Sequence, residues 1–103
     1  MSDRLTKLLP LLEKTPRDTF LLYAVGMECK KLREFDRAIQ YFKKATDVDP
    51  AYAYAYYQIG QTHELAGDTA AAKAAYQSGI AAAQKAGDGH AAGEIAAALE
   101  AIG

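Results

Sequence analysis

AYAYAYYQIGQTHELA, residues 51–66, has the spacing of a helix that is apolar on two faces. At about 100° per residue, one stripe of this helix contains Tyr52, Tyr56, Ile59, Gly60 and His63. A second stripe, about a third of a turn away, contains Tyr54, Tyr57, Gln61 and Glu64. A helix of this kind is expected between other helices, with one face in the core and the other face free for a second role.

The remainder of the chain is also predicted to be helical. We expect helices over residues 3–14, 19–32, 35–47, 51–66, 69–86 and 90–102. Pro10 is expected to kink or shorten the first helix, and Pro50 follows the end of the third. Gly67 suits a left-handed residue at the end of the fourth. Since no segment has the alternating pattern of a strand, the predicted fold class is all-α.

The sequence repeats itself after 34 residues. The aligned pairs are Leu22/Tyr56, Tyr23/Tyr57, Val25/Ile59, Gly26/Gly60, Cys29/His63, Ala38/Ala72 and Phe42/Tyr76. A period of this length indicates an array of helix pairs. We expect the two glycines to face Ala38 and Ala72 within each pair, and Phe42 and Tyr76 to fill the space between successive pairs.

This pattern resembles the tetratricopeptide repeat (TPR) family. The motif positions are Leu22-x2-Val25-Gly26-x2-Cys29, Ala38-x3-Phe42 and Pro50 in the first copy, and Tyr56-x2-Ile59-Gly60-x2-His63 and Ala72-x3-Tyr76 in the second. The resemblance implies a right-handed α-solenoid fragment of antiparallel helix pairs, with about six helices. It also implies one domain over residues 1–103, with a half-repeat or cap helix at 3–14, repeats at 19–52 and 53–86, and a capping helix at 90–102.

Composition excludes several function classes. Twelve Lys and Arg residues against 13 Asp and Glu residues give a net charge of −1, so neither nucleic acid nor an anionic membrane is an expected partner. No run of apolar residues is long enough to span a bilayer. Cys29 is the only cysteine and is expected to be a small buried apolar residue. A soluble cytoplasmic protein is the expectation.

No catalytic or metal-binding motif is complete. His63-Glu64 matches the start of the metalloprotease motif HExxH, but Gly67 stands where the second histidine is required. His63 is instead expected to be a partly buried packing residue. We therefore predict a protein without catalytic residues, metal or cofactor, and hence not an enzyme.

The TPR resemblance implies that the first helix of each pair lines a concave groove that binds a peptide or protein. The groove residues implied here are Phe20, Tyr23, Met27, Lys30, Lys31, Tyr54, Tyr57, Gln61 and Glu64. Some family members hold a C-terminal carboxylate with a clamp of Lys, Asn and Arg at positions occupied here by Tyr23, Met27, Tyr57 and Gln61, none of which is a cation. That clamp is not expected in this chain. The alternative is that several of these side chains pack beneath the first or last helix.

The predicted function is therefore a protein–protein interaction module, an adaptor or scaffold for an unidentified protein or peptide segment. The protein is expected to be a monomer or a weak homo-oligomer. The alternative is structural self-association through the tyrosine face or an end helix, without a separate ligand.

Overall fold

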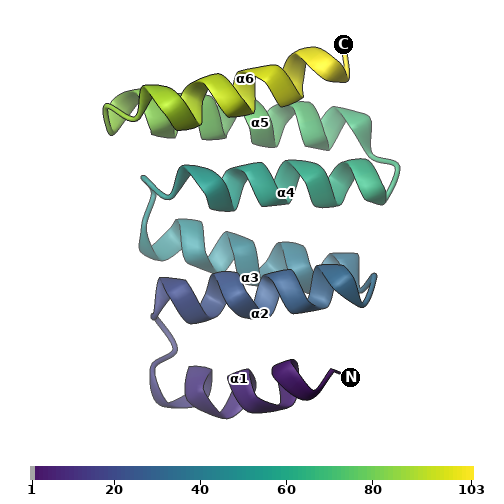
Figure 1. Ribbon diagram of the computed structural model, residues 1–103, viewed down its shortest axis with the longest axis vertical. Coiled ribbons are helices and arrows are strands. Elements are labelled where there is room, and N and C mark those ends of the chain that lie inside the picture. Colours follow the sequence, from purple (N-terminus) through teal and green to yellow (C-terminus); the bar gives the residue numbers. More distant parts are fainter. Residues whose placement is uncertain (1) are drawn as a thin grey trace.

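The computed structural model describes residues 2–103 and contains a stack of six α-helices (Figure 1). The helices are α1 (Asp3–Lys14), α2 (Thr19–Lys31), α3 (Phe35–Val48), α4 (Ala53–Leu65), α5 (Thr69–Lys85) and α6 (Gly89–Ala101). Each predicted boundary lies within two residues of the observed one. The described residues contain no strand, and the all-α prediction is confirmed.

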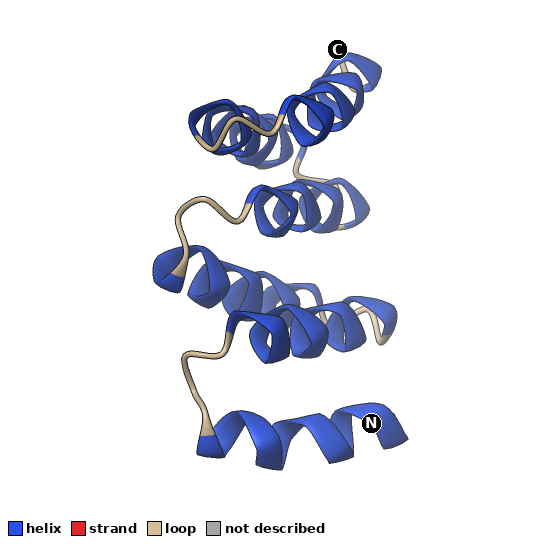
Figure 2. Ribbon diagram, turned by 60° about the vertical axis from the view of Figure 1, so that its left-hand side comes forward, coloured by secondary structure: helices blue, strands red, loops and turns tan. Residues whose placement is uncertain are grey.

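Neighbours in sequence are neighbours in space. The pairs α2 with α3 and α4 with α5 pack most extensively, and α3 joins the two pairs by packing against α4. At the ends of the stack, α1 packs on α2, and α6 packs on α5 and touches α4 (Figures 1 and 2). The stack measures 37 × 29 × 17 Å. This nearest-neighbour arrangement is that of an α-solenoid.

Polar side chains cap the N-termini of four of the helices. The side chains of Ser2, Asp18, Asp68 and Asp88 each accept a hydrogen bond from a backbone N–H in the first turn that follows. Such a cap satisfies a donor that has no partner within the helix. These caps fix where α1, α2, α5 and α6 begin.

Residues with positive φ lie in three of the turns between successive helices. Gly67 and Gly87 have φ of 85° and 74°, as glycine at a helix end allows. Arg33 occupies the equivalent place between α2 and α3 with φ of 59°. A side chain at this φ is strained, and the Arg33 guanidinium lies 5.0 Å from the centre of the Phe35 ring.

The expectation that Pro10 shortens the first helix is wrong. α1 continues past Pro10 to Lys14. Leu5 and Leu12, which are 0% and 8% exposed, lie on either side of Pro10 in the sequence and are both in the core shared with α2. Their burial on both sides of the proline offsets the hydrogen bond that proline cannot donate.

The expected packing of the two motif glycines is also wrong. Gly26 and Gly60 face the rings of Phe42 and Tyr76, rather than Ala38 and Ala72. A Cβ at Gly26 would lie 2.6 Å from Cε1 of Phe42. The absence of a side chain on one helix therefore makes room for an aromatic ring from its partner within the same pair. Both rings are fully buried.

The core has two parts. One cluster joins α1 to α4 and contains Cys29, which is fully buried, as expected. Burial also raises the pKa of the Cys29 thiol. The second cluster joins α4 to α6 around Tyr76 and Ile95. None of the helices described is both long and apolar enough to cross a bilayer.

Candidate functional site

The nine predicted groove residues lie on α2 and α4, and we call the surface that they form the α2–α4 face. Its α2 half is open. Phe20 is 70% exposed, while Tyr23 and Met27 are half-buried. A cavity of about 270 Å³ lies beside these residues, lined by Arg4, Phe20, Tyr23, Ala24, Met27, Glu28 and Lys31. An exposed aromatic residue beside a hollow is a suitable anchor for a partner.

Tyr23 is held by its aromatic neighbours. Its ring stacks on Tyr52 with centroids 5.3 Å apart, and it packs against Phe42 in an edge-to-face arrangement with centroids 5.6 Å apart. The burial that these contacts bring raises the pKa of the Tyr23 hydroxyl. Tyr23 therefore forms a fixed wall of the cavity. Phe20 also lines the cavity, but most of its side chain is exposed to solvent.

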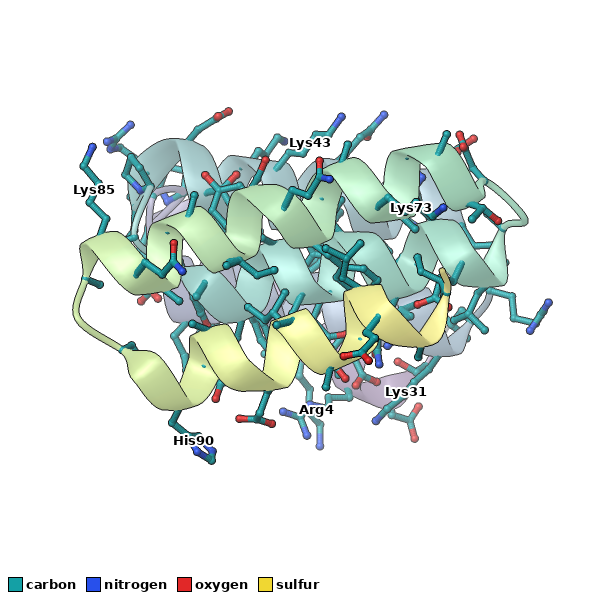
Figure 3. The ribbon with its side chains drawn as sticks, turned by 90° about the horizontal axis from the view of Figure 1, so that it is seen from above. Arg4, Lys31, Lys43, Lys73, Lys85 and His90 are labelled. Carbon is teal, nitrogen blue, oxygen red and sulfur yellow. The ribbon has the colours of Figure 1, made fainter. Side chains whose placement is uncertain are left out.

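The rim of this cavity contains a buried carboxylate that the sequence did not reveal. Glu28 is only 5% exposed. It accepts hydrogen bonds from the Ser2 hydroxyl at 3.2 Å and the Lys31 ammonium at 3.3 Å, and Arg4 Nε lies 3.7 Å away. Arg4 and Lys31 thus neutralise Glu28, and the Arg4 contact also joins α1 to α2. In Figure 3, Arg4 and Lys31 project on one side of the stack, opposite Lys43.

The residues on the α4 half of the face were predicted to be free for a ligand, but three of them contact side chains of α5 or α6. The Tyr54 hydroxyl donates to Glu94 of α6 at 2.6 Å, and this hydrogen bond to a carboxylate raises the pKa of Tyr54 to about 12. Glu64 accepts a hydrogen bond from the Tyr76 hydroxyl. Tyr57 packs beside Tyr76 with ring centroids 6.0 Å apart. The alternative of packing beneath the last helix therefore holds for Tyr54, which α6 engages.

A hydrogen-bonded network connects the two halves. The Lys30 ammonium donates to Oε1 of Gln58 at 2.8 Å and to Oε1 of Gln61 at 3.0 Å. Gln58 donates onward to the Tyr23 hydroxyl at 3.1 Å, and Gln61 donates to the Tyr57 hydroxyl at 2.7 Å. Desolvation lowers the pKa of Lys30. The network sets the positions of four of the predicted residues: Tyr23, Lys30, Tyr57 and Gln61.

Gln58 is the member of this network that sequence reasoning missed. It is 8% exposed and falls between the two stripes of its helix. Its partners, Tyr23 and Lys30, are 35 and 28 residues earlier in the chain. A pattern within one helix contains no signal for such contacts, and the repeat alignment places Ala24 at the equivalent position.

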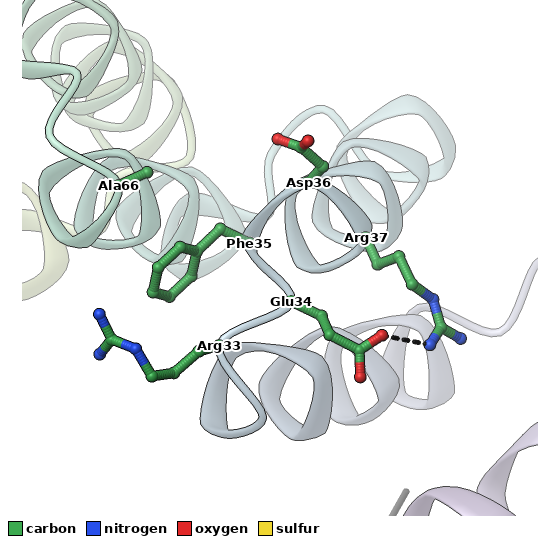
Figure 4. Close-up of a pocket in the computed structure, with 6 residues that line it drawn as sticks. All are labelled: Arg33, Glu34, Phe35, Asp36, Arg37 and Ala66. Atoms are coloured by element: carbon green, nitrogen blue, oxygen red, sulfur yellow. Dashed lines mark hydrogen bonds and ion pairs between the residues drawn. The ribbon is translucent and has the colours of Figure 1, made fainter.

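Hollows also lie outside this face, and two of them are lined in part by aromatic side chains. One, of about 470 Å³, is bordered by α3, α4 and α5 and includes half-buried Tyr56 and His63. The other, of about 420 Å³, lies at the turn between α2 and α3, where Phe35 and Arg33 stand beside Ala66 (Figure 4). His63 is thus a partly buried packing residue, as predicted.

Comparison with known proteins identifies the repeats. A model described as "TPR repeat" matches residues 26–67, and a second, described as "Tetratricopeptide repeat", matches residues 53–85. Together they span more than half of the chain. The chain belongs to the tetratricopeptide repeat family. TPR domains are typically non-enzymatic scaffolds, and TPR repeats in general mediate protein interactions.

Individual proteins are also similar to this chain in sequence or in fold. TPR repeat-containing protein PA0015 of Pseudomonas aeruginosa is 27% identical over 78 residues, which cover 76% of this chain and 74% of PA0015. The solution structure of BPP2914 from Bordetella parapertussis is 30% identical, with a TM-score of 0.84 over 99% of this chain and 89% of that one. PcrH, solved in complex with the chaperone binding region of PopD, shares the fold, with 19% identity and a TM-score of 0.87 over 95% of this chain and 74% of that one.

Proposed function

We propose that this protein is an interaction module that holds a peptide segment of a protein partner on the α2–α4 face. Phe20 and Met27 provide the apolar contacts, and Tyr23 forms the fixed wall beside them. Binding of this kind involves no covalent step. Its affinity benefits from a preorganised surface, because such a surface loses less entropy on association.

The exposure of Phe20 is the observation that carries this proposal. A phenylalanine that is 70% exposed contributes little to the folding of its own chain, and a cavity of about 270 Å³ lies beside it. Tyr54, at the equivalent position of the second copy, is half-buried and hydrogen-bonded to α6. Of these two equivalent aromatic positions, only Phe20 on α2 therefore leaves its ring largely exposed.

The family and one structural neighbour support a peptide as the guest. TPR repeats are in general protein-interaction modules. PcrH, which has the same fold, was solved with the chaperone binding region of PopD. On the present chain, a segment lying along α2 would contact Phe20, Met27 and the Lys30 network together.

The proposal is tested by selecting peptides from a random library on the immobilised protein and titrating one into isotope-labelled protein. Amide chemical-shift changes are expected to concentrate on α2 and the facing residues of α4. Changes confined to the hollow around Tyr56 and His63, or to the turn at Phe35, would place the binding surface elsewhere.

Self-association through the same face is a distinguishable outcome. In that case, light scattering would give a mass that rises with concentration in the absence of peptide. Phe20→Ala would then abolish the rise. A constant monomer mass, together with saturable peptide binding, supports the proposed function.

A further inference from the structure

Lys30 is a half-buried cation without an acidic partner among the residues that the structure describes. The ion pairs in that part of the chain involve Arg4, Lys31, Arg37 and His90, and none includes Lys30. The two observed acceptors of Lys30 are the neutral amide oxygens of Gln58 and Gln61. An ammonium group has three N–H donors, so one donor is left over.

The surrounding charges leave this cation uncompensated. Glu28 is already paired with Arg4 and Lys31, and Glu64 accepts from Tyr76. Glu94 accepts from Tyr54. A charge that has been partly removed from water without a counterion is attracted strongly to an incoming carboxylate, because the local dielectric is lower than that of bulk water.

The geometry points to an acidic peptide segment as the ligand of the α2–α4 face. We propose that a Glu or Asp side chain of the bound segment pairs with Lys30 while an apolar side chain of the same segment packs on Phe20. This inference rests on the proposed function. It assigns to Lys30 the role of selecting the peptide by its charge.

The spacing within the ligand follows from the helix. Phe20 and Lys30 are ten residues apart on α2, which is about 15 Å at a rise of 1.5 Å per residue. An extended peptide covers that distance in about four to five residues. We therefore expect the carboxylate to lie four to five residues from the apolar anchor.

A side-chain carboxylate fits Lys30 better than a chain terminus. The two cations that line the cavity beside Phe20, Arg4 and Lys31, are engaged by Glu28. One spare N–H can serve one oxygen of a carboxylate that keeps part of its hydration. A terminal carboxylate held between several cations would need Arg4 or Lys31 as a second partner, and both already pair with Glu28.

The test uses synthetic peptides with one Phe anchor, neutral small residues elsewhere, and a single Glu placed at successive distances from the anchor. Each has a matched Gln peptide, and both ends are blocked. Fluorescence anisotropy at pH 7 is expected to show about fivefold tighter binding for Glu than for Gln when the acid lies four or five residues from Phe. Raising the salt concentration should reduce this preference.

Protein variants assign the preference to one residue. Lys30→Met should bind the Glu and Gln peptides equally, whereas Lys30→Arg should retain the preference. Lys43→Met is the matched control, because Lys43 is an exposed lysine of α3, outside the α2–α4 face, and projects on the side opposite Arg4 and Lys31 (Figure 3); it should behave as the wild type. Thermal melts of each variant establish that it is folded.

The outcomes separate this inference from the function on which it rests. Equal binding of Glu and Gln peptides by the wild type, or a preference that survives Lys30→Met, would overturn the role of Lys30 and leave the groove intact. Absence of binding by every peptide would overturn both. A further Gln peptide with a free C-terminus serves as a last comparison: if only this peptide bound more tightly than its blocked counterpart, the ligand of Lys30 would be a terminal carboxylate rather than a side chain, and the inference would be overturned.

Discussion

Gly60 packs its backbone directly against the ring of Tyr76, and a Cβ on this glycine would overlap that ring. Tyr76 is fully buried, and its hydroxyl is fixed by Glu64, so the ring cannot move aside at small cost. Gly60→Ala should therefore lower the free energy of unfolding by about 1–3 kcal/mol, despite the better helix propensity of alanine.

Gly93 provides the matched control for that substitution. It lies inside α6 and is exposed, and a Cβ added there would meet no neighbouring side chain or helix within 4 Å. Gly93→Ala should raise the free energy of unfolding by about 0.5–1 kcal/mol. Urea denaturation of both variants measures these two changes in the free energy of unfolding. Equal effects of the two substitutions would refute the close packing at Gly60.

Arg33 and Gly67 occupy equivalent turns with positive φ. Arg33→Gly should stabilise the protein by up to about 1 kcal/mol, because glycine adopts this backbone without strain. Gly67→Arg should destabilise it by about 1 kcal/mol. Thermal melts of the two reciprocal variants measure both effects. A loss of stability in Arg33→Gly would mean that the contact of Arg33 with Phe35 outweighs the strain.

Ile95 anchors α6 to the second core. Its side chain is fully buried and approaches Gly79 of α5. Ile95→Ala should cost about 2–4 kcal/mol of unfolding free energy, since it leaves a cavity between α5 and α6. Ile102→Ala, at a half-buried position, should cost less. Similar losses at the two positions in urea denaturation would show that α6 is not held through Ile95.

Alkaline pH should destabilise the fold through its tyrosines. Burial raises the pKa of Tyr23, Tyr52 and Tyr76, and the hydrogen bond to Glu94 raises that of Tyr54 to about 12. In the unfolded chain these groups lose their protons near pH 10, before the folded chain does. Their stabilising contribution is complete below pH 10 and falls as the pH rises toward the folded-state values.

Urea denaturation at a series of pH values from about 8 to 12 checks this expectation. The decline in unfolding free energy above about pH 10 should be smaller in Tyr76→Phe, which has one linked group fewer. A stability that is constant across this range would contradict the assigned shifts.

Sequence periodicity predicted the helices well because each boundary depends on local chemistry. Gly67 and Asp68, for example, end α4 and cap α5 through bonds within a few residues. The packing of the motif glycines was misassigned, because the register between partner helices decides whether Gly26 meets Ala38 or Phe42.

The site was predictable only in part for the same reason. The 34-residue repeat places Phe20 and Tyr54 at equivalent positions, yet Glu94 of α6 engages only Tyr54. The network around Gln58 and Lys30 depends on side chains about one repeat apart, which no single-helix pattern contains.

The affinity of a library-selected peptide for Phe20→Ala and Phe35→Ala tests the central claim most directly. Both variants remove a phenylalanine ring, but Phe35 lies at the α2–α3 turn beside Ala66 (Figure 4) and is not one of the residues of the α2–α4 face. With both variants shown by thermal melts to be folded, Phe20→Ala should weaken binding at least tenfold, about 1.4 kcal/mol, while Phe35→Ala leaves it unchanged. Unchanged affinity in Phe20→Ala would contradict peptide binding on the α2–α4 face.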